Sequence, residues 1–377
     1  SLINIVKKLT FCHILLVKKK KSVYTNSVEV IMLSFDYKDA ILIVTVTFLF
    51  SVLIMPVMKI IAKYINAMDV PRDNRRLHTD TVPKLGGLGI FLSFLLGYVL
   101  FGKQSVQMNS ILIGSFIIIL TGLIDDINPL SVKYKLIGQF ISALLIPLYG
   151  NIVLTEIGAF GISIEFGMLS IPLTILFIMA VINCINLIDG LDGLAGGISS
   201  IYFLTIGIIA LTLQNANGLD VLLTFIMLGS TLGFLVHNFP PAKIFAGDTG
   251  SMFLGYIISI IALLGFKNVT LSSFIIPILL LFIPIFDTTC AIIRRLLKGE
   301  SIGKPDKKHL HHQLMNMTSS TTKTLLIIYF VDILFAASSL VYVFKGQVLG
   351  IILYSTLLIL TIWFLITSSI IKDKKKK

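Results

Sequence analysis

Asn183-Cys-Ile-Asn-Leu-Ile-Asp-Gly-Leu-Asp-Gly-Leu-Ala-Gly-Gly197 interrupts an otherwise apolar sequence. Two amides and two carboxylates recur in it at three-residue steps: Asn183, Asn186, Asp189 and Asp192. Hydrocarbon offers these side chains no hydrogen-bond partners, so something else must satisfy them. On a continuous helix they would spread around half of the circumference, but Gly190 and Gly193 can end the helix and let them converge. The stretch predicts a site for an ion or a polar substrate at a membrane edge; a polar helix end followed by an ordinary turn is the alternative.

The composition is that of an integral membrane protein. Hydrophobic residues make up 56% of the 377 residues and charged residues 13%, and the mean hydropathy is +0.95. These values lie outside those of soluble domains. The net charge of +12 does not indicate nucleic-acid binding, because the basic residues lie in short loops and tails between apolar segments. Cys12, Cys184 and Cys290 lack the spacing of metal ligands or disulfides and are expected to be small buried side chains.

The apolar segments predict an all-α, polytopic membrane protein with about eleven transmembrane helices. The predicted spans cover residues 40–62, 86–101, 109–124, 134–150, 170–187, 194–213, 219–237, 250–265, 272–293, 324–343 and 348–370. We expect residues 32–377 to form a single transmembrane domain. Residues 1–31 carry clustered lysines, and Met32 would be a natural start of translation. We therefore interpret residues 1–31 as a non-native or poorly ordered extension, with a basic targeting segment as the alternative.

The distribution of basic residues predicts the orientation in the plasma membrane. If the first span runs inward, the loops on the inner side and the C-terminal tail carry 21 Lys and Arg residues. The outer loops beyond residue 31 carry only Lys38, Lys103, Lys267 and Lys345. Because cytoplasmic loops are enriched in Lys and Arg, the N-terminus is expected outside and the C-terminus in the cytoplasm.

This orientation places every unusual polar stretch on the cytoplasmic side, whereas the outer loops are short and nearly featureless. A transporter would bury its polar groups near the middle of the bilayer and often shows internal repeats, of which we find none that convinces. The sequence therefore favours an enzyme with a cytoplasm-facing active site over a cation-coupled transporter.

Asp125 and Asp126 are predicted at the C-terminal end of the third span, where the helix dipole disfavours carboxylates. A cation would offset this cost, and so would a structural contact with Lys133 or Lys135. Adjacent residues on a helix point about 100° apart, so the two carboxylates are expected to have different roles.

Asp248, in Gly247-Asp-Thr-Gly-Ser251, has the pattern of an ordinary helix N-cap. The glycines would also let a phosphate approach a helix N-terminus, and Asp248 faces the same compartment as the other acids. Carboxylate and amide oxygens in a set without cysteine indicate Mg²⁺, or Mn²⁺, as the metal ion.

His309-Leu-His-His312 follows Arg294-Arg295 and a lysine-rich segment. Zinc is less favoured here because further ligands at a suitable spacing are lacking. A basic loop that faces a group of acids fits a diphosphate bridged by a divalent cation. Asp287 lies inside the ninth predicted span between Pro284 and Arg294. The prolines of that span could open a lipid-facing groove there, or Asp287 pairs with a neighbouring helix or Arg294.

Together these motifs resemble the polyprenyl-phosphate N-acetylhexosamine-1-phosphate transferases, from about Met32 to the last span. Four stretches carry the resemblance: Asp125-Asp126 with Pro129-Leu-Ser, Asn183 to Gly193, Asn238 to Ser251, and Arg294 to His312. The His-Leu-His-His form is similar to the branch that uses UDP-N-acetylglucosamine. The phospho-N-acetylmuramoyl-pentapeptide transferases usually carry three consecutive His and are the alternative. Lys84 and Ala246 depart from the family pattern.

The resemblance implies transfer of phospho-N-acetylglucosamine from UDP to undecaprenyl phosphate, with release of UMP. It implies that Asp248 and Asn186 hold Mg²⁺ and that Asn183, Asp189 and Asp192 orient the nucleotide. The residues that would contact phosphate are Lys133, His309, His311, His312 and Arg294, with His78 a further candidate and Asp287 in the substrate-binding set.

Asp125 or Asp126 would position the lipid phosphate in a single displacement, or form an acyl-phosphate in a double displacement; the single displacement is favoured. The product would start a lipid-linked envelope polysaccharide of teichoic-acid or O-antigen type. Polytopic enzymes of this kind often form homodimers, but the sequence leaves the oligomeric state open.

Overall fold

The computed structural model describes residues 36–69, 81–159, 162–213, 218–267, 275–297, 299 and 309–367. Every described residue belongs to the second of two units of the chain, Leu33–Lys377. The predicted extension at residues 1–31 lies outside the described residues, so the expected division of the chain stays a prediction. His78 also lies outside them.

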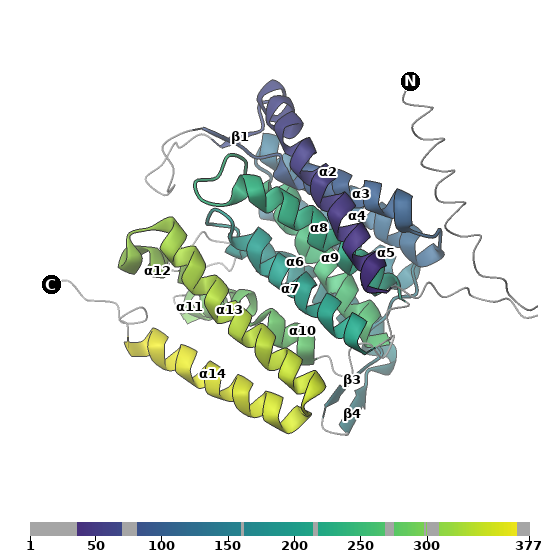
Figure 1. Cartoon of the computed structure of the whole chain (residues 1–377), viewed down its shortest axis with the longest axis vertical. Helices are drawn as coiled ribbons and strands as arrows, with labels where there is room; N and C mark the ends of the chain where they lie inside the picture. The colour runs from purple at the N-terminus through teal and green to yellow at the C-terminus, as the bar shows by residue number, and fades with distance from the viewer. Residues whose placement is uncertain are drawn as a thin grey trace, which may run out of the picture. The chain divides into compact units, whose positions relative to one another are not determined.

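The second unit consists mostly of helices (Figure 1). The α-helices are α2 (Tyr37–Tyr64), α3 (Gly86–Phe101), α4 (Val106–Ile127), α5 (Val132–Leu148), α6 (Ser170–Ile188), α7 (Leu194–Thr212), α8 (Leu219–Asn238), α9 (Gly247–Lys267), α10 (Ile275–Leu280), α11 (Phe282–Leu297), α12 (Leu310–Thr318), α13 (Thr321–Phe344) and α14 (Gln347–Thr367). Eight helices in the described part are long and apolar enough to cross a membrane. The polytopic helical fold is confirmed, but the number of eleven spans is not.

The ninth predicted span, residues 272–293, is not one continuous helix in the structure. It contains α10 and α11, which are separated at Leu281. Pro284 has no N–H to donate to the carbonyl of residue 280, so the helical hydrogen-bond pattern is weakened at this point. The sequence predicted a bend here, and the structure interrupts the helix at Leu281, where two i→i−4 hydrogen bonds still connect α10 to α11.

Two short antiparallel hairpins depart from the purely helical prediction. β1 (Met68–Asp69) pairs with β2 (Val82–Pro83), and β3 (Glu156–Ala159) pairs with β4 (Ile162–Glu165). Strands of two to four residues are too short to show a clear alternation in the sequence. The hairpin β3–β4 lies in a loop that we expected to be featureless, whereas β1–β2 lies beside the functional site.

Helix α9 is the most buried of the eight long apolar helices, and it packs against α3, α4, α6 and α8. Glycines allow its first turn to approach two neighbouring helices. A Cβ atom on Gly87 would lie 2.1 Å from the backbone nitrogen of Gly250, and one on Gly122 would lie 2.4 Å from the Cα of Thr249. The Gly86 and Gly87 N–H groups also donate to the carbonyls of Phe245 and Ala246, both at 2.9 Å. These contacts fix the start of α9.

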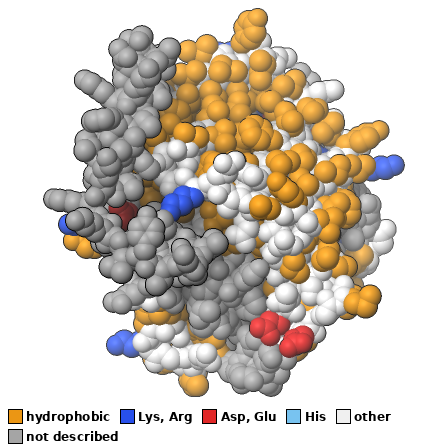
Figure 2. All heavy atoms as spheres, turned by 90° about the vertical axis from the view of Figure 1, so that its right-hand side faces the viewer, with side chains coloured by type: hydrophobic (Ala, Val, Ile, Leu, Met, Phe, Trp, Pro, Cys, Tyr) orange, Lys and Arg blue, Asp and Glu red, His pale blue; other side chains and the backbone are white. Residues whose placement is uncertain are grey.

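The outer helices expose apolar side chains, as expected for a surface in contact with lipid. Leu53 and Ile60 of α2 are 72% and 69% exposed, and Ile359 of α14 is 66% exposed. Figure 2 shows a face on which hydrophobic side chains cover a broad area with few charged groups among them. The polar side chains gather instead at one end of the helices.

Candidate active site

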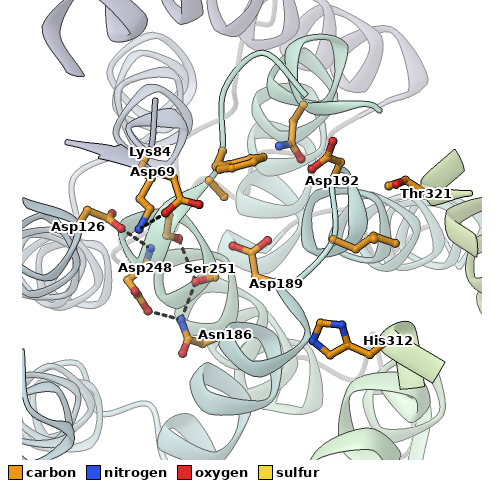
Figure 3. Close-up of a pocket in the computed structure, with 16 residues that line it drawn as sticks. Asp69, Lys84, Asp126, Asn186, Asp189, Asp192, Asp248, Ser251, His312 and Thr321 are labelled. Atoms are coloured by element: carbon orange, nitrogen blue, oxygen red, sulfur yellow. Dashed lines mark hydrogen bonds and ion pairs between the residues drawn. The ribbon is translucent and has the colours of Figure 1, made fainter. Parts of the chain in front are cut away.

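A cavity of about 430 Å³ lies where α6 and α8 end and α9 begins. Figure 3 shows carboxylates from separate elements directed toward it. Five acids line the cavity: Asp69, Asp126, Asp189, Asp192 and Asp248. The basic residues in the lining are Lys84 and His312. Polar stretches that are far apart in the sequence therefore meet at one end of the bundle, as the sequence predicted.

Asp126 holds the N-terminus of α9. Its Oδ1 accepts a hydrogen bond from the Asp248 N–H at 2.9 Å. Its Oδ2 accepts from the Thr249 N–H at 3.0 Å and from the Thr249 hydroxyl at 2.6 Å. The first N–H groups of a helix have no partner within the helix, and the dipole favours an anion there. The N-terminus of α9 therefore offsets the cost of placing Asp126 at the C-terminal end of α4.

Gly247 makes this arrangement possible. Its φ angle is +70°, in the left-handed region that glycine adopts without steric cost. A Cβ atom on it would meet the Asp126 carboxylate. Any other residue at this position would therefore push Asp126 away from the start of α9.

Asp125 points to different partners, as expected for adjacent residues on a helix. Its Oδ1 accepts from the Leu130 N–H at 2.7 Å, and its Oδ2 lies 2.7 Å from the Lys135 ammonium group. The same ammonium group lies 3.4 Å from Asp248 Oδ1. The structural Asp–Lys contact considered for Asp125 is thus present, and Lys135 links α4 to α9.

Lys133, which was predicted to hold phosphate, is exposed and does not line the cavity. It lies two residues before Lys135 on α5, so the two side chains leave the helix about 200° apart. Both lysines are close to Asp125 in the sequence, and the orientation of the first turn of α5 determines that Lys135 faces the acids.

Asn186 and Asp248, the two residues predicted to hold the metal ion, are in direct contact. The Asn186 amide donates to Asp248 Oδ1 at 2.6 Å and to the Ser251 hydroxyl at 2.8 Å. Since the amide acts as a donor in both contacts, Asn186 orients Asp248 in this arrangement (Figure 3).

Asp189 follows the last residue of α6, and its carboxylate is directed into the cavity without a hydrogen bond to any described residue. Burial, and to a smaller extent the neighbouring carboxylates Asp248, Asp126 and Asp192, raise its pKa to about 8. Such a concentration of negative charge favours a bound cation.

The donors in the cavity fit Mg²⁺ by their chemistry. Within the described residues, no three His, Cys, Asp or Glu side chains lie close enough to hold a metal ion by themselves. Mg²⁺ is commonly held by one or two carboxylates, with substrate phosphates and water completing its shell. Asp189 and Asp248 are the residues that would supply those carboxylates.

Asp192 and Asn238 secure the loop between α8 and α9. Asp192 Oδ2 accepts from the Ala242 N–H at 2.9 Å. Asn238 accepts from the Gly193 N–H at 3.0 Å and donates to the Ile244 carbonyl at 2.8 Å. Both residues line the cavity, so the same contacts that shape the loop also form part of its wall.

Asn183 lies away from the cavity. Its amide donates to Gln139 Oε1 on α5 and to the Met179 carbonyl, both at 2.7 Å. Of the four polar side chains at three-residue steps, Asn183 contacts a neighbouring helix, whereas Asn186, Asp189 and Asp192 line the cavity. The predicted contact of Asn183 with the nucleotide gains no support from this placement.

Asp287 anchors α12. Its Oδ2 lies 2.8 Å from His309 Nδ1, and its Oδ1 accepts from the Leu310 N–H at 2.8 Å. Both Asp287 and His309 are buried. Of the two alternatives for Asp287, the structure shows pairing with a neighbouring segment, although its partner is His309.

The three histidines have different surroundings. His312 lines the cavity, whereas His311 is buried beside Gly190, where a Cβ atom would lie 2.5 Å from its Nε2. Burial lowers the pKa of His311 to about 3, and the charge of His312 acts in the same direction. His311 is therefore neutral near pH 7 and seats α12 on the turn between α6 and α7. Arg294 is half-buried and does not line the cavity.

Lys84 and Asp69 are cavity residues that the predicted set of site residues did not include. They form an ion pair of 3.1 Å beside the β1–β2 hairpin, and both line the cavity. Lys84 was noted in the sequence as a departure from the family pattern in Pro83-Lys-Leu-Gly-Gly87. Asp69 had no such signal, because the sequence around it has no distinctive motif.

Residues 108–266 match the model of glycosyl transferase family 4. The chain is 42% identical over 299 residues to the probable undecaprenyl-phosphate N-acetylglucosaminyl 1-phosphate transferase of Bacillus subtilis, covering 78% of this chain and 83% of that protein. It is 32% identical over 301 residues to the undecaprenyl-phosphate alpha-N-acetylglucosaminyl 1-phosphate transferase of Haemophilus influenzae, covering 76% and 82%. It is 31% identical over 302 residues to the decaprenyl-phosphate N-acetylglucosaminephosphotransferase of Mycobacterium tuberculosis, covering 72% and 74%.

The family match covers the cavity segments from the end of α4 to the start of α9, while Asp69, Lys84, His312 and Thr321 of the lining lie outside it. The chain therefore belongs to glycosyl transferase family 4, the polyprenyl-phosphate N-acetylhexosamine-1-phosphate transferases, in the branch of the undecaprenyl-phosphate N-acetylglucosaminyl 1-phosphate transferases.

Proposed function

We propose that this protein transfers phospho-N-acetylglucosamine from UDP-N-acetylglucosamine to undecaprenyl phosphate and releases UMP. The names of its relatives support a polyprenyl phosphate acceptor and an N-acetylglucosamine 1-phosphate group. The product would start a lipid-linked envelope polysaccharide of teichoic-acid or O-antigen type. The cavity would face the cytoplasm, where nucleotide sugars are made, in line with the basic inner loops.

The observation that carries this proposal is the charge arrangement of the cavity. The Asp189 carboxylate accepts no hydrogen bond from the described residues, and Asp248 lines the same cavity. A divalent cation held by these carboxylates would neutralise the charge on a diphosphate. Lys84 and His312, on the cavity wall, would contact the phosphate oxygens.

Other polar residues hold Asp248 in position. Lys135 and Asn186 contact its side chain, and Asp126 fixes the start of the helix that carries it. Mn²⁺ could replace Mg²⁺, because both prefer oxygen ligands.

The hydrogen bonds of Asp125 and Asp126 support a single displacement. Three donors occupy the oxygens of Asp126, while the Leu130 N–H and Lys135 occupy those of Asp125. A carboxylate bound in this way is a weak nucleophile, because attack would require loss of these hydrogen bonds. In the proposed step an oxygen of the lipid phosphate attacks the sugar-bearing phosphorus of the donor. The bond from that phosphorus to the UMP oxygen breaks, and UMP leaves with the electron pair.

The test is UMP release by the purified protein with undecaprenyl phosphate and Mg²⁺. We expect release with UDP-N-acetylglucosamine and none after addition of EDTA. Release only with UDP-N-acetylmuramoyl-pentapeptide would assign the protein to the phospho-N-acetylmuramoyl-pentapeptide transferases instead. If neither donor gives UMP in folded protein, the proposed function is wrong, and solute flux in liposomes would then test the transporter alternative.

A further inference from the structure

Lys59, His237 and Lys243 form a basic cluster outside the cavity lining. Lys59 of α2 places its Nζ 3.5 Å from Nδ1 of His237, near the end of α8. Lys243 follows in the loop after α8: its backbone N–H donates to the His237 carbonyl at 2.8 Å, and its charge interacts with Lys59 and His237. Helices α2 and α8 pack closely along their lengths, so the cluster joins two elements of the bundle.

The hydrogen bonds of His237 define its protonation state. Its Nε2 lies 3.1 Å from the Val52 carbonyl, which can only accept, so Nε2 carries the proton. Nδ1 then carries a lone pair toward the Lys59 ammonium group. The imidazole is neutral in this arrangement and holds Lys59 in position, leaving further N–H groups of the lysine for another acceptor.

The two lysines lack an acidic partner within the described part of the chain. Lys84 and Lys135, by contrast, each form an ion pair with an aspartate. A helix dipole does not account for the cluster, because Lys59 precedes the last turn of α2 and Lys243 lies outside any helix. Neighbouring positive charges are costly without a counter-ion, so the arrangement favours the binding of an anion.

The surroundings indicate which anion this is. Ile60 on α2 and Val236 on α8 are the sequence neighbours of Lys59 and His237, and they are 69% and 57% exposed. Exposed apolar side chains next to paired cations are typical of the boundary between hydrocarbon and headgroups. A lipid would place its phosphate at the lysines and its acyl chains along these apolar residues.

We propose that Lys59, His237 and Lys243 bind the phosphate headgroup of an anionic phospholipid from the surrounding bilayer. This site is separate from the cavity and does not depend on the proposed transferase activity. A bound lipid would join the ends of α2 and α8, and α8 carries Asn238 in the cavity wall.

The test is the binding of phosphatidylglycerol to the full chain in detergent, measured by native mass spectrometry, with phosphatidylcholine as the neutral reference. Each lysine near a membrane surface contributes about a fivefold gain in affinity for anionic lipid. We expect Lys59→Gln with Lys243→Gln to weaken phosphatidylglycerol binding by roughly 25-fold. The control is Lys38→Gln with Lys345→Gln. It removes the same charge, but Lys38 lies at the start of α2, away from Lys59, and Lys345 follows the end of α13. This variant should leave binding unchanged.

Unchanged binding in the Lys59/Lys243 variant, or equal weakening in the Lys38/Lys345 variant, would overturn the proposal. Inorganic phosphate is expected to compete weakly, since it lacks acyl chains; effective competition by it would show a free-phosphate site instead. A higher KM for undecaprenyl phosphate with unchanged phosphatidylglycerol binding would assign the cluster to the substrate. Equal melting temperatures of the variants exclude misfolding as the cause.

Discussion

At the scale of single residues, the acids of the cavity divide into those that carry an open carboxylate and those that hold the structure. The Asp189 carboxylate accepts no hydrogen bond from the described residues, while the Asp126 carboxylate accepts three. Both stand in motifs of equal prominence in the sequence. The two aspartates therefore differ in role because their hydrogen-bond partners differ, although the residue type is the same.

Asp248→Asn is expected to lower kcat by about 100-fold or more, because a neutral amide loses the charge that the proposed cation requires. The variant should also need a higher Mg²⁺ concentration for half-maximal rate. Both quantities follow from UMP release measured over a range of Mg²⁺ concentrations. Full activity with an unchanged Mg²⁺ requirement would remove Asp248 as a metal ligand.

Asp126→Ala is expected to destabilise the protein by about 1–3 kcal/mol, because the N–H groups at the start of α9 lose their buried acceptor. Thermal unfolding in detergent measures this loss. Thr249→Val is the matched control, because it removes only the hydroxyl contact with Asp126 and should cost less. An unchanged melting temperature for Asp126→Ala would show that Asp126 does not hold α9.

At the scale of elements, α12 is docked at two points. The Asp287 carboxylate contacts His309 and the Leu310 N–H at the start of α12. His311 packs against Gly190 on the turn after α6. The docking places His312 in the cavity wall. The position of this basic element therefore depends on two buried histidines that do not line the cavity.

Gly190→Ala should displace α12 and reduce activity, since the added methyl group would overlap His311. The double variant Gly190→Ala with His311→Ala should be less destabilised than the sum of the two single changes, because the clash is removed. Gly196→Ala is the control, as its added Cβ would lie 3.3 Å from the nearest side-chain atom. Simple additivity of the two changes would contradict the docking contact.

The burial of His311 predicts a dependence of stability on pH. Its pKa is about 3 in the folded protein, below the value of about 6.5 in an unfolded chain. Between these values the unfolded chain binds the extra proton, so the free energy of unfolding falls as the pH decreases below 6.5, by up to about 1.4 kcal/mol per pH unit. His311→Gln should show a smaller slope in unfolding measured from pH 7.5 to 5. Identical slopes would show that His311 is not buried as a neutral group.

At the scale of the whole molecule, the acids of the cavity gather at one end of the helices, and hydrophobic side chains cover a broad area of the face in Figure 2. Ser319 lies at the cavity end of α13, near Thr321 of the cavity lining, and Lys345 lies at its other end. The charge distribution predicts that the cavity end is cytoplasmic.

This orientation can be tested by labelling single cysteines with a membrane-impermeant thiol reagent in intact cells, after replacement of the native cysteines by serine. Lys345→Cys should be labelled from outside, and Ser319→Cys only after the membrane is opened. The reverse pattern would place the cavity on the outer side and exclude a cytoplasmic donor.

The sequence by itself determined the membrane setting, the positions of the long helices and the residue types of the site. Apolar segments of this length have few alternatives to a helix, because every backbone N–H and C=O must be satisfied within hydrocarbon. The motifs at Asp125, Asn183 to Gly193, and Asp248 could be identified in the sequence because polar side chains are costly within a membrane and are therefore rare in such segments.

Only the tertiary structure decided which polar groups meet. Lys135, and not Lys133, reaches Asp125 and Asp248; Asn183 turns to Gln139; and Asp69 joins the cavity through a short hairpin. These outcomes depend on the angles at which helices begin and end, and on glycine contacts such as Gly87 with Gly250. A one-dimensional pattern does not contain these angles, because they arise from the packing of segments far apart in the chain.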